Sequence, residues 1–302
     1  MTVLTVAALQ MRTTRAVARN IDDLLAMAKD AVARGARFVQ SPEMSNIIER
    51  NRPAFFEAIR PEDADPMLAA VRDFARQHAV HFHLGSIAVK EGDKLANRGL
   101  LVGPDGGVVA RYDKLHLFDV DLPNGESWRE SNTYTAGTCA VVAPLALPQD
   151  LVRKPDATFR GPAVRDAILG MGICYDLRFP ALFRALAEAG ADILTAPACF
   201  TRQTGEAHWS VLQRARAIET GSFMISAAQG GVHEDGRETY GHSIIIDPWG
   251  RVLAEAGDTP GPIFAALDLA AVADARSRIP ALRHARDIAV TRQGFGVEQA
   301  AE

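Results

Sequence analysis

Residues 167–180 restrict the fold more than any other segment, because they join a buried strand to a helix start through a cysteine. Residues 167–173 form an apolar run typical of a strand buried on both faces. Cys174 follows, and Asp176 and Pro180 are typical of the beginning of a helix. In α/β proteins this junction can present a nucleophile, since the helix begins with free N–H groups that favour negative charge. The segment alone does not distinguish a nucleophile from a small buried hydrophobic residue.

Strand-like and helix-like patterns alternate along the rest of the chain. The predicted strands cover residues 3–11, 37–40, 80–89, 100–102, 108–112, 191–196, 222–228, 243–246, 251–254 and 263–267. Helices are predicted to begin at Asn20 and at Asp65-Pro66, to cover 181–189, and to run from about 206 to 220. Turn sequences at 104–107 and 247–250 predict two hairpins. This order predicts an α/β fold in which helices cover mixed sheets.

The composition indicates one large globular unit. With 302 residues, 48% of them hydrophobic, the chain can bury a large core, and no linker-like stretch divides it. We therefore expect a single domain over residues 1–302. A formal charge of -4 and dispersed arginines argue against a nucleic-acid partner.

The N-terminal residues, the absence of a long apolar segment and the cysteines predict a soluble cytoplasmic protein. The first ten residues alternate like a strand and lack the charged start and apolar core of a signal peptide. No apolar segment approaches the ~20 residues needed to span a bilayer, so we expect no membrane partner. Cys139, Cys174 and Cys199 cannot all pair within the chain, which argues against a disulfide scaffold and favours a reducing compartment.

Several chemically active side chains follow predicted strands or hairpin arms. Glu43, Lys114, Cys174 and the segment around Phe200 all occupy such positions. Because ligands in α/β proteins collect at the carboxyl ends of strands, these distant residues could converge. Taken singly, Glu43 is equally compatible with a solvated carboxylate, and Lys114 with a surface lysine.

Together these groups have the chemistry of acyl transfer. A cysteine attacks as its thiolate, and a nearby ammonium both lowers the pKa of the thiol and stabilises an oxyanion. Burial raises the pKa of a carboxyl group towards neutrality, so that it can remove the thiol proton and return it to a leaving amine. The set therefore predicts amide cleavage through a thioester.

Four blocks of the sequence resemble, in order, the carbon-nitrogen hydrolases of the nitrilase superfamily. They are SPEM at 41–44, YDKLHLFDV at 112–120, GICYDLRFP at 172–180 and GHSIIIDPWG at 241–250. The resemblance implies a catalytic triad of Glu43, Lys114 and Cys174, with Glu130 as an additional active-site glutamate. It also implies a four-layer αββα sandwich and homodimers that join through their helical faces.

Within the superfamily the chain resembles the branch that contains ω-amidase and deaminated glutathione amidase. Residues 119–125, 129–132, 227–231 and 238–243 are more similar to the deaminated glutathione enzymes. The resemblance implies a small amide substrate. An α-keto acid amide, an N-carbamoyl amino acid or a nitrile are alternatives within the same chemistry.

The resemblance also implies roles in binding and catalysis. Lys114 and the backbone N–H of Tyr175 would hold the oxyanion, and no metal or organic cofactor is required. Arg178 would bind the acid group of the substrate, with Phe200 and Thr204 lining the same end of the pocket. The alternative for Arg178 is an ion pair on a helix surface.

One segment departs from the family pattern. Residues 146–162 are longer than the tight connection expected before the nucleophile strand, and predict an inserted surface loop. Because this loop carries Arg153, Lys154 and Arg160, it could also form a rim that selects anionic substrates.

Two further classes of protein remain open on the sequence. A metal-binding protein could use His78, His81, His83 and a cysteine, although the spacing matches no familiar zinc site. A silent homologue could act as an interaction module, although all three residues of the implied triad are present.

Overall fold

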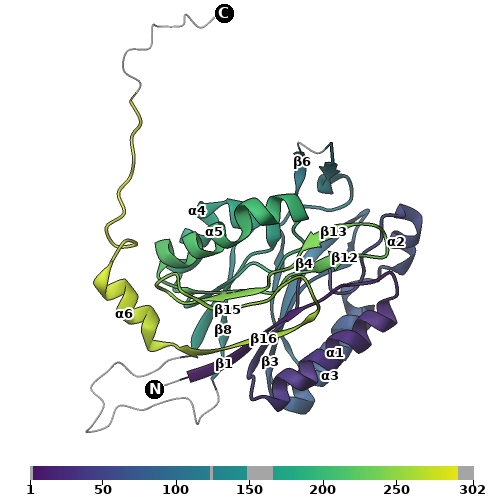
Figure 1. Ribbon diagram of the computed structural model, residues 1–302, viewed down its shortest axis with the longest axis horizontal. Coiled ribbons are helices and arrows are strands. Elements are labelled where there is room, and N and C mark those ends of the chain that lie inside the picture. Colours follow the sequence, from purple (N-terminus) through teal and green to yellow (C-terminus); the bar gives the residue numbers. More distant parts are fainter. Residues whose placement is uncertain (1–2, 123–124, 148–165, 292–302) are drawn as a thin grey trace, which may run out of the picture.

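Two six-stranded sheets stacked between layers of helices form the body of the protein (Figure 1). This computed structural model describes residues 3–122, 125–147 and 166–291. Most of the insertion expected at 146–162, namely residues 148–162, lies outside the described residues. Its flanks meet, because Leu147 N donates to Asp166 Oδ1 at 3.1 Å.

The first sheet has the strand order β16-β1-β2-β3-β4-β5. Its strands are β1 (Val3–Gln10), β2 (Phe38–Gln40), β3 (His81–Glu91), β4 (Lys94–Val102), β5 (Val108–Asp113) and β16 (Gly261–Asp268). β1, β2 and β3 are parallel, whereas β4, β5 and β16 pair antiparallel. The C-terminal strand β16 thus closes the edge beside the N-terminal strand.

The second sheet has the order β15-β14-β11-β10-β9-β8. Its strands are β8 (Val141–Leu145), β9 (Ala167–Met171), β10 (Ile193–Thr195), β11 (Phe223–Ser226), β14 (Ile244–Ile246) and β15 (Val252–Glu255). Here β9, β10 and β11 are parallel. Two small ribbons join β6 (Asp119–Asp121) to β7 (Ser127–Arg129), and β12 (Gly230–Val232) to β13 (Glu238–Tyr240).

Helices cover the outer face of each sheet (Figure 1). α1 (Val17–Ala33) and α3 (Pro66–His78) pack on the first sheet, and α4 (Pro180–Glu188) and α5 (Arg202–Thr220) on the second. The described residues also contain α2 (Arg52–Ala58), α6 (Ala270–Arg278) and three 3₁₀ turns, η1 (Glu62–Ala64), η2 (Glu130–Asn132) and η3 (Cys174–Arg178). The predicted four-layer αββα sandwich is confirmed. None of the described helices is long and apolar enough to cross a membrane.

Side-chain alternation along β1 lets one strand serve two cores. Leu4, Val6 and Ala8 pack in the core between the two sheets, whereas Ala7 and Leu9 pack against α1 and α3. Successive residues of a strand point to opposite faces, so a fully apolar strand is expected wherever both faces are covered.

Two predicted helix starts differ in their outcome. Asp65 caps α3 as predicted, because its Oδ1 accepts a hydrogen bond from Leu68 N at 2.9 Å. α1 begins at Val17, before the predicted start at Asn20. Asn20 instead lies within α1, and its buried side chain forms hydrogen bonds with Thr14 and with the carbonyl of Asn46.

Gly85 lies where a segment of each sheet approaches closely. It sits in β3 at a break in the β3–β4 register between Leu84 and Ile87. A Cβ atom at this position would lie 2.0 Å from the Ser41 carbonyl oxygen and 2.6 Å from Pro197 Cβ. Only glycine therefore allows the segments after β2 and after β10 to converge.

Gly85→Ala is expected to lower the free energy of unfolding by at least about 2 kcal/mol, since neither backbone segment can yield without moving a sheet. Denaturant unfolding measures this change. Gly257→Ala is the matched control, because a Cβ there meets nothing within 4 Å. Equal stability of the two variants would contradict the close approach.

Candidate active site

Three segments from the two sheets bring Glu43, Lys114 and Cys174 together in one cavity. Glu43 follows β2 and Lys114 follows β5, both in the first sheet, whereas Cys174 follows β9 in the second. All three side chains are at most 7% exposed. The site therefore lies between the sheets, where a charge meets little water.

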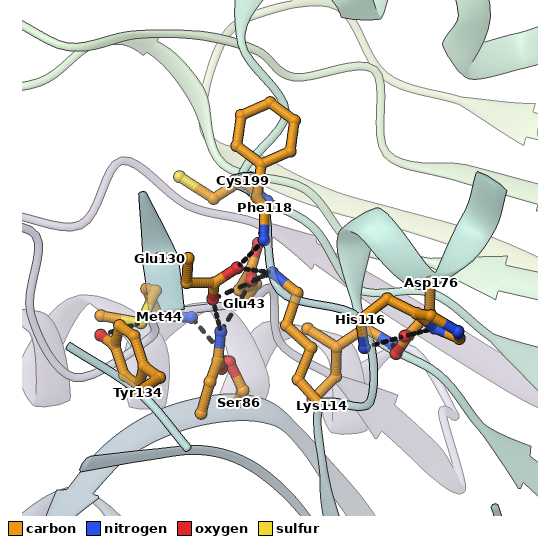
Figure 2. Close-up of polar contacts among 12 residues, drawn as sticks. Glu43, Met44, Ser86, Lys114, His116, Phe118, Glu130, Tyr134, Asp176 and Cys199 are labelled. Carbon is orange, nitrogen blue, oxygen red and sulfur yellow. Dashed lines mark hydrogen bonds and ion pairs between the residues drawn. The ribbon is translucent and has the colours of Figure 1, made fainter. Parts of the chain in front are cut away.

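The segment that carries Glu43 is held on several sides. Met44 has a left-handed backbone (φ 57°), and its N–H donates to Ser86 Oγ at 3.0 Å (Figure 2). The Glu43 carbonyl accepts from Gln229 Nε2 at 2.9 Å, which ties it to the segment that follows β11 of the second sheet. Because its backbone is fixed from both sheets, the Glu43 side chain keeps one direction.

Lys114 lies between two carboxylates (Figure 2). Its Nζ is 2.8 Å from Glu43 Oε1, 3.1 Å from Glu130 Oε1 and 2.9 Å from Glu130 Oε2. Glu130, in η2, also accepts from Phe118 N at 2.7 Å. The ammonium is thus surrounded by charge-assisted hydrogen bonds, which are the strong kind in a buried setting.

Two further donors complete the surroundings of the Glu43 carboxylate. Asn97 Nδ2, in β4, lies 2.9 Å from Glu43 Oε1 and 3.1 Å from Glu130 Oε1. Cys199 N donates to Glu43 Oε2 at 2.8 Å. Sequence reasoning missed both. Asn97 stands in the middle of a strand, and the Cys199 contact comes from the backbone, so no residue pattern signals either.

Cys174 sits at a sharp turn between β9 and η3. Its backbone is left-handed (φ 50°), an unusual conformation for a residue with a side chain. Its N–H is engaged by the Pro197 carbonyl at 2.9 Å. The next N–H, that of Tyr175, lies in the first turn of η3, where backbone donors lack an intrahelical acceptor. It is therefore a suitable donor for an oxyanion.

Asp176 connects this turn to the segment that carries Lys114. Its fully buried carboxylate accepts from Ile173 N at 2.9 Å, Tyr112 OH at 2.6 Å and His116 N at 3.0 Å, and lies 2.7 Å from His116 Nδ1. The prediction that Asp176 opens the following helix is wrong: α4 begins at Pro180, and its N-cap is Phe179. Asp176 instead caps the 3₁₀ turn and links two sides of the site.

The charge states differ from those expected from the sequence. Burial disfavours ionisation of Glu43, but attraction to Lys114 and hydrogen bonds from Cys174, Lys114 and Asn97 outweigh it and lower the Glu43 pKa. Burial raises the pKa of the Cys174 thiol well above 9.0, helped by repulsion from Glu43 and only partly opposed by Lys114. Burial works against the Lys114 charge, yet Glu130 and Glu43 raise its pKa well above 10.5.

Both predicted shifts, a raised carboxyl pKa and a lowered thiol pKa, are therefore wrong. The Glu43 pKa is lowered because attraction to Lys114 and several hydrogen bonds outweigh the effect of burial. The Cys174 pKa is raised because burial, followed by repulsion from Glu43, outweighs the attraction of Lys114. The resting site combines an ionised Glu43, an ammonium and a neutral thiol.

The cavity has a volume of about 330 Å³. Phe200 and Thr204 line it, where the resemblance places them, together with Tyr175. Arg178 is not among the lining residues: its Nη1 lies 3.2 Å from His208 Nδ1, and its guanidinium lies over the rings of Tyr175 and Phe200. Four other arginines line the cavity, namely Arg50, Arg52, Arg129 and Arg237.

Two of the histidines considered for a metal-binding protein, His81 and His83, lie in strand β3 of the first sheet. His83 is fully buried and lies 3.0 Å from Gln40 Nε2, and burial lowers its pKa to about 3. Burial likewise lowers the pKa of His81 to about 4. Among the described residues, no group of three or more His, Cys, Asp or Glu side chains is arranged to hold a metal ion.

Comparison with known proteins places the chain in a family. The sequence model of the carbon-nitrogen hydrolase family matches residues 5–277. A probable hydrolase nit2 of Schizosaccharomyces pombe is 37% identical over 285 residues, which cover 92% of this chain and 96% of the relative. Deaminated glutathione amidase of Synechocystis sp. is 35% identical with the same coverage, and that of Homo sapiens is 35% identical over 93% of this chain and 82% of its own.

Solved structures share the fold. The NitFhit protein of C. elegans has a TM-score of 0.81 and 31% identity, and the match covers 94% of this chain but 65% of that longer protein. Nit3 of Saccharomyces cerevisiae, a member of branch 10 of the nitrilase superfamily, has a TM-score of 0.77 and 24% identity over 92% of this chain and 94% of its own. The chain therefore belongs to the carbon-nitrogen hydrolase family and is a hydrolase that acts on carbon–nitrogen bonds other than peptide bonds.

Proposed function

We propose that the protein cleaves a linear amide of a small carboxylic acid, with Cys174 as nucleophile and Glu43, Lys114 and Glu130 as the other catalytic residues. The observation that carries the proposal is the buried Lys114 ammonium, held by Glu43 and Glu130 in the cavity that Cys174 lines. This arrangement supplies a base, a cation for an oxyanion and a thiol within one water-poor space.

The attack is a general-base step. Because the pKa of Cys174 is raised and that of Glu43 is lowered, the free thiol does not ionise by itself at neutral pH. Glu43 takes the thiol proton as sulfur bonds to the amide carbonyl carbon, so that proton transfer and bond formation proceed together. The carbonyl oxygen becomes an oxyanion, which Lys114 Nζ and the Tyr175 N–H stabilise.

Collapse of this intermediate breaks the carbon–nitrogen bond. Glu43 returns its proton to the departing amine and is ionised again, leaving a thioester on Cys174. Water then attacks the thioester: Glu43 accepts a water proton, Glu130 positions the water, and the proton returns to sulfur as the acid leaves. Every proton is carried by Glu43, and no metal or organic cofactor takes part.

For the substrate we propose an amide like that of the deaminated glutathione amidases. The support is sequence identity of 35% to enzymes of that name over most of the chain. An α-keto acid ω-amide is the nearest alternative. An N-carbamoyl amino acid would release carbon dioxide together with ammonia, so product analysis separates that activity from amide cleavage.

We also propose that the chain is one domain over residues 1–302 and works as a cytoplasmic homodimer. Free Cys139, Cys174 and Cys199 support a reducing compartment.

On the outer helical face Val211 and Ile218 of α5 are 69% and 53% exposed, and Trp249 in the β14–β15 turn is 59% exposed. Sedimentation analysis is expected to give a dimer, which Ile218→Asp should dissociate. A monomeric parent protein would contradict the dimer.

Cys174→Ala is expected to lower kcat by at least about 10³-fold while the free energy of unfolding changes by no more than about 1 kcal/mol. Cys139→Ala is the matched control, because Cys139 is exposed and does not line the cavity. Mass spectrometry of the acid-quenched enzyme should find a thioester on Cys174 during turnover of deaminated glutathione, α-ketoglutaramate or a simple amide. Full activity of Cys174→Ala would overturn the mechanism.

Lys114→Met is expected to abolish activity and to lower the free energy of unfolding at pH 7 by about 3–5 kcal/mol, because it leaves the buried Glu43 and the partly buried Glu130 without a cation. The folded pKa of Glu43 lies below its ordinary 4.5, so its stabilising contribution is present above that pH and is lost as the pH falls through the folded pKa. The deficit of Lys114→Met should therefore shrink towards low pH, as the unpaired carboxyl groups take up protons.

Denaturant unfolding from pH 4 to pH 8 measures this dependence. Lys114→Met combined with Glu43→Gln is the matched control, since it removes one of the unpaired charges and should recover part of the lost stability at pH 7. A deficit that stays constant over this pH range would contradict the electrostatic explanation.

A further inference from the structure

The cavity wall contains a pair of arginines that the proposed mechanism does not use. Arg50 follows the Glu43 segment, and Arg237 lies in the turn between β12 and β13. Both line the cavity beside Trp128: the guanidinium carbons lie 5.9 Å and 4.9 Å from the centre of its ring system. Two chain segments far apart in sequence thus place cations around one aromatic surface.

One buried carboxylate lies within ion-pair distance of both guanidinium groups, although its Oδ2 accepts a hydrogen bond from neither. Asp235 Oδ2 lies 3.8 Å from Arg50 Nε and 3.7 Å from Arg237 Nη2, and the Asp235 side chain has no exposed surface. Its other oxygen accepts from Arg237 N at 2.9 Å and shapes the turn. Asp235 does not line the cavity. A substrate therefore meets the two arginines, with their carboxylate behind them.

The pair keeps unused capacity for an anion. Two positive charges share one negative charge at distances beyond a normal hydrogen bond, so the cluster has a net charge of +1. Within the described part of the chain, Arg237 Nε has no hydrogen-bond partner although it is buried. By contrast, two other charged side chains are already paired: Arg129 makes two short hydrogen bonds to Asp121, and Glu49 forms an ion pair with Arg15.

Arg237 also lies near the reacting groups. Arg237 Nη1 is 3.9 Å from Cys199 Sγ, and the N–H of the same Cys199 donates to the Glu43 carboxylate. A single residue thus separates the guanidinium from the proposed base. A ligand group held by Arg237 would belong to a molecule that also reaches Cys174 in the same cavity.

We propose that Arg50 and Arg237, positioned by Asp235, form a subsite for a carboxylate of the amide substrate. This inference rests on the proposed function and names its substrate class: amides that carry a negative charge away from the scissile bond. A guanidinium binds a carboxylate through two parallel hydrogen bonds, and the buried setting strengthens them. Binding there would orient the scissile carbonyl over the thiol.

Charge-matched substrates test the subsite. Glutaramate and hexanamide differ in a charge on the acyl side, and N-acetylglycine and N-propylacetamide differ in a charge on the amine side. Arg237→Gln should lower kcat/KM by about 10- to 100-fold for the charged member of at least one pair, chiefly through KM. The uncharged member should change by less than about threefold.

Three further variants sharpen the result. Arg50→Gln should act in the same direction with a smaller effect, because Arg50 is 51% exposed. Arg237→Lys, which keeps the charge but not the paired donors, should be intermediate. Arg184→Gln, on the surface of α4, is the matched control and should behave as the parent enzyme.

Loss of charged and uncharged substrates alike in Arg237→Gln would overturn the proposal. So would charge selectivity that depends on Arg178 and not on Arg237. A second measurement needs no turnover: calorimetry of glutarate binding to the Cys174→Ala protein, with and without Arg237→Gln. If the parent enzyme cleaves no amide, the proposed function fails, while loss of glutarate binding in the double variant would still support the subsite. Equal binding by both proteins would overturn it.

Discussion

The contact on which the site depends is that of the buried Lys114 ammonium with two carboxylates, the buried Glu43 and the partly buried Glu130. Removing a charge from water is costly unless partners replace the water, and here Glu43, Glu130 and Asn97 supply a connected set of them. The same contacts keep Glu43 ionised and Lys114 protonated. The cluster is therefore at once a structural element of the interior and the source of the reactivity, and neither role can change without the other.

The sequence was sufficient to predict the parts of the site that depend on local residue patterns. The runs that end at Glu43, Lys114 and Cys174 have strand periodicity followed by polar residues, and the structure brings these three together. The layers of the sandwich were predictable for the same reason. The short strands β6, β7, β12 and β13 were not, because they are largely exposed and lack the apolar run that marks the equally short but buried β2, β10 and β14.

What escaped prediction depends on contacts between distant segments. The direction of the Glu43 and Cys174 pKa shifts follows from how deeply each group is buried and from the charges and hydrogen bonds around it, and a linear sequence does not give these contacts. Asp176 carries a local helix-start signal, yet bonds across to Tyr112 and His116. The resemblance implied Arg178 as the anion ligand, whereas the cavity wall includes Arg237 and not Arg178.

The bond between Leu147 and Asp166 has a consequence for how such enzymes can diverge. It closes the chain at the base of β8 and β9, whose pairing runs from Val141 with Met171 to Leu145 with Ala167. The position of β9, the strand that leads to Cys174, is thus fixed by its pairing with β8 and by this bond, and does not depend on the length of chain between Leu147 and Asp166. Since doubling the length of a flexible loop costs only about 0.6 kcal/mol, this is a point where insertions and deletions can accumulate without disturbing the nucleophile.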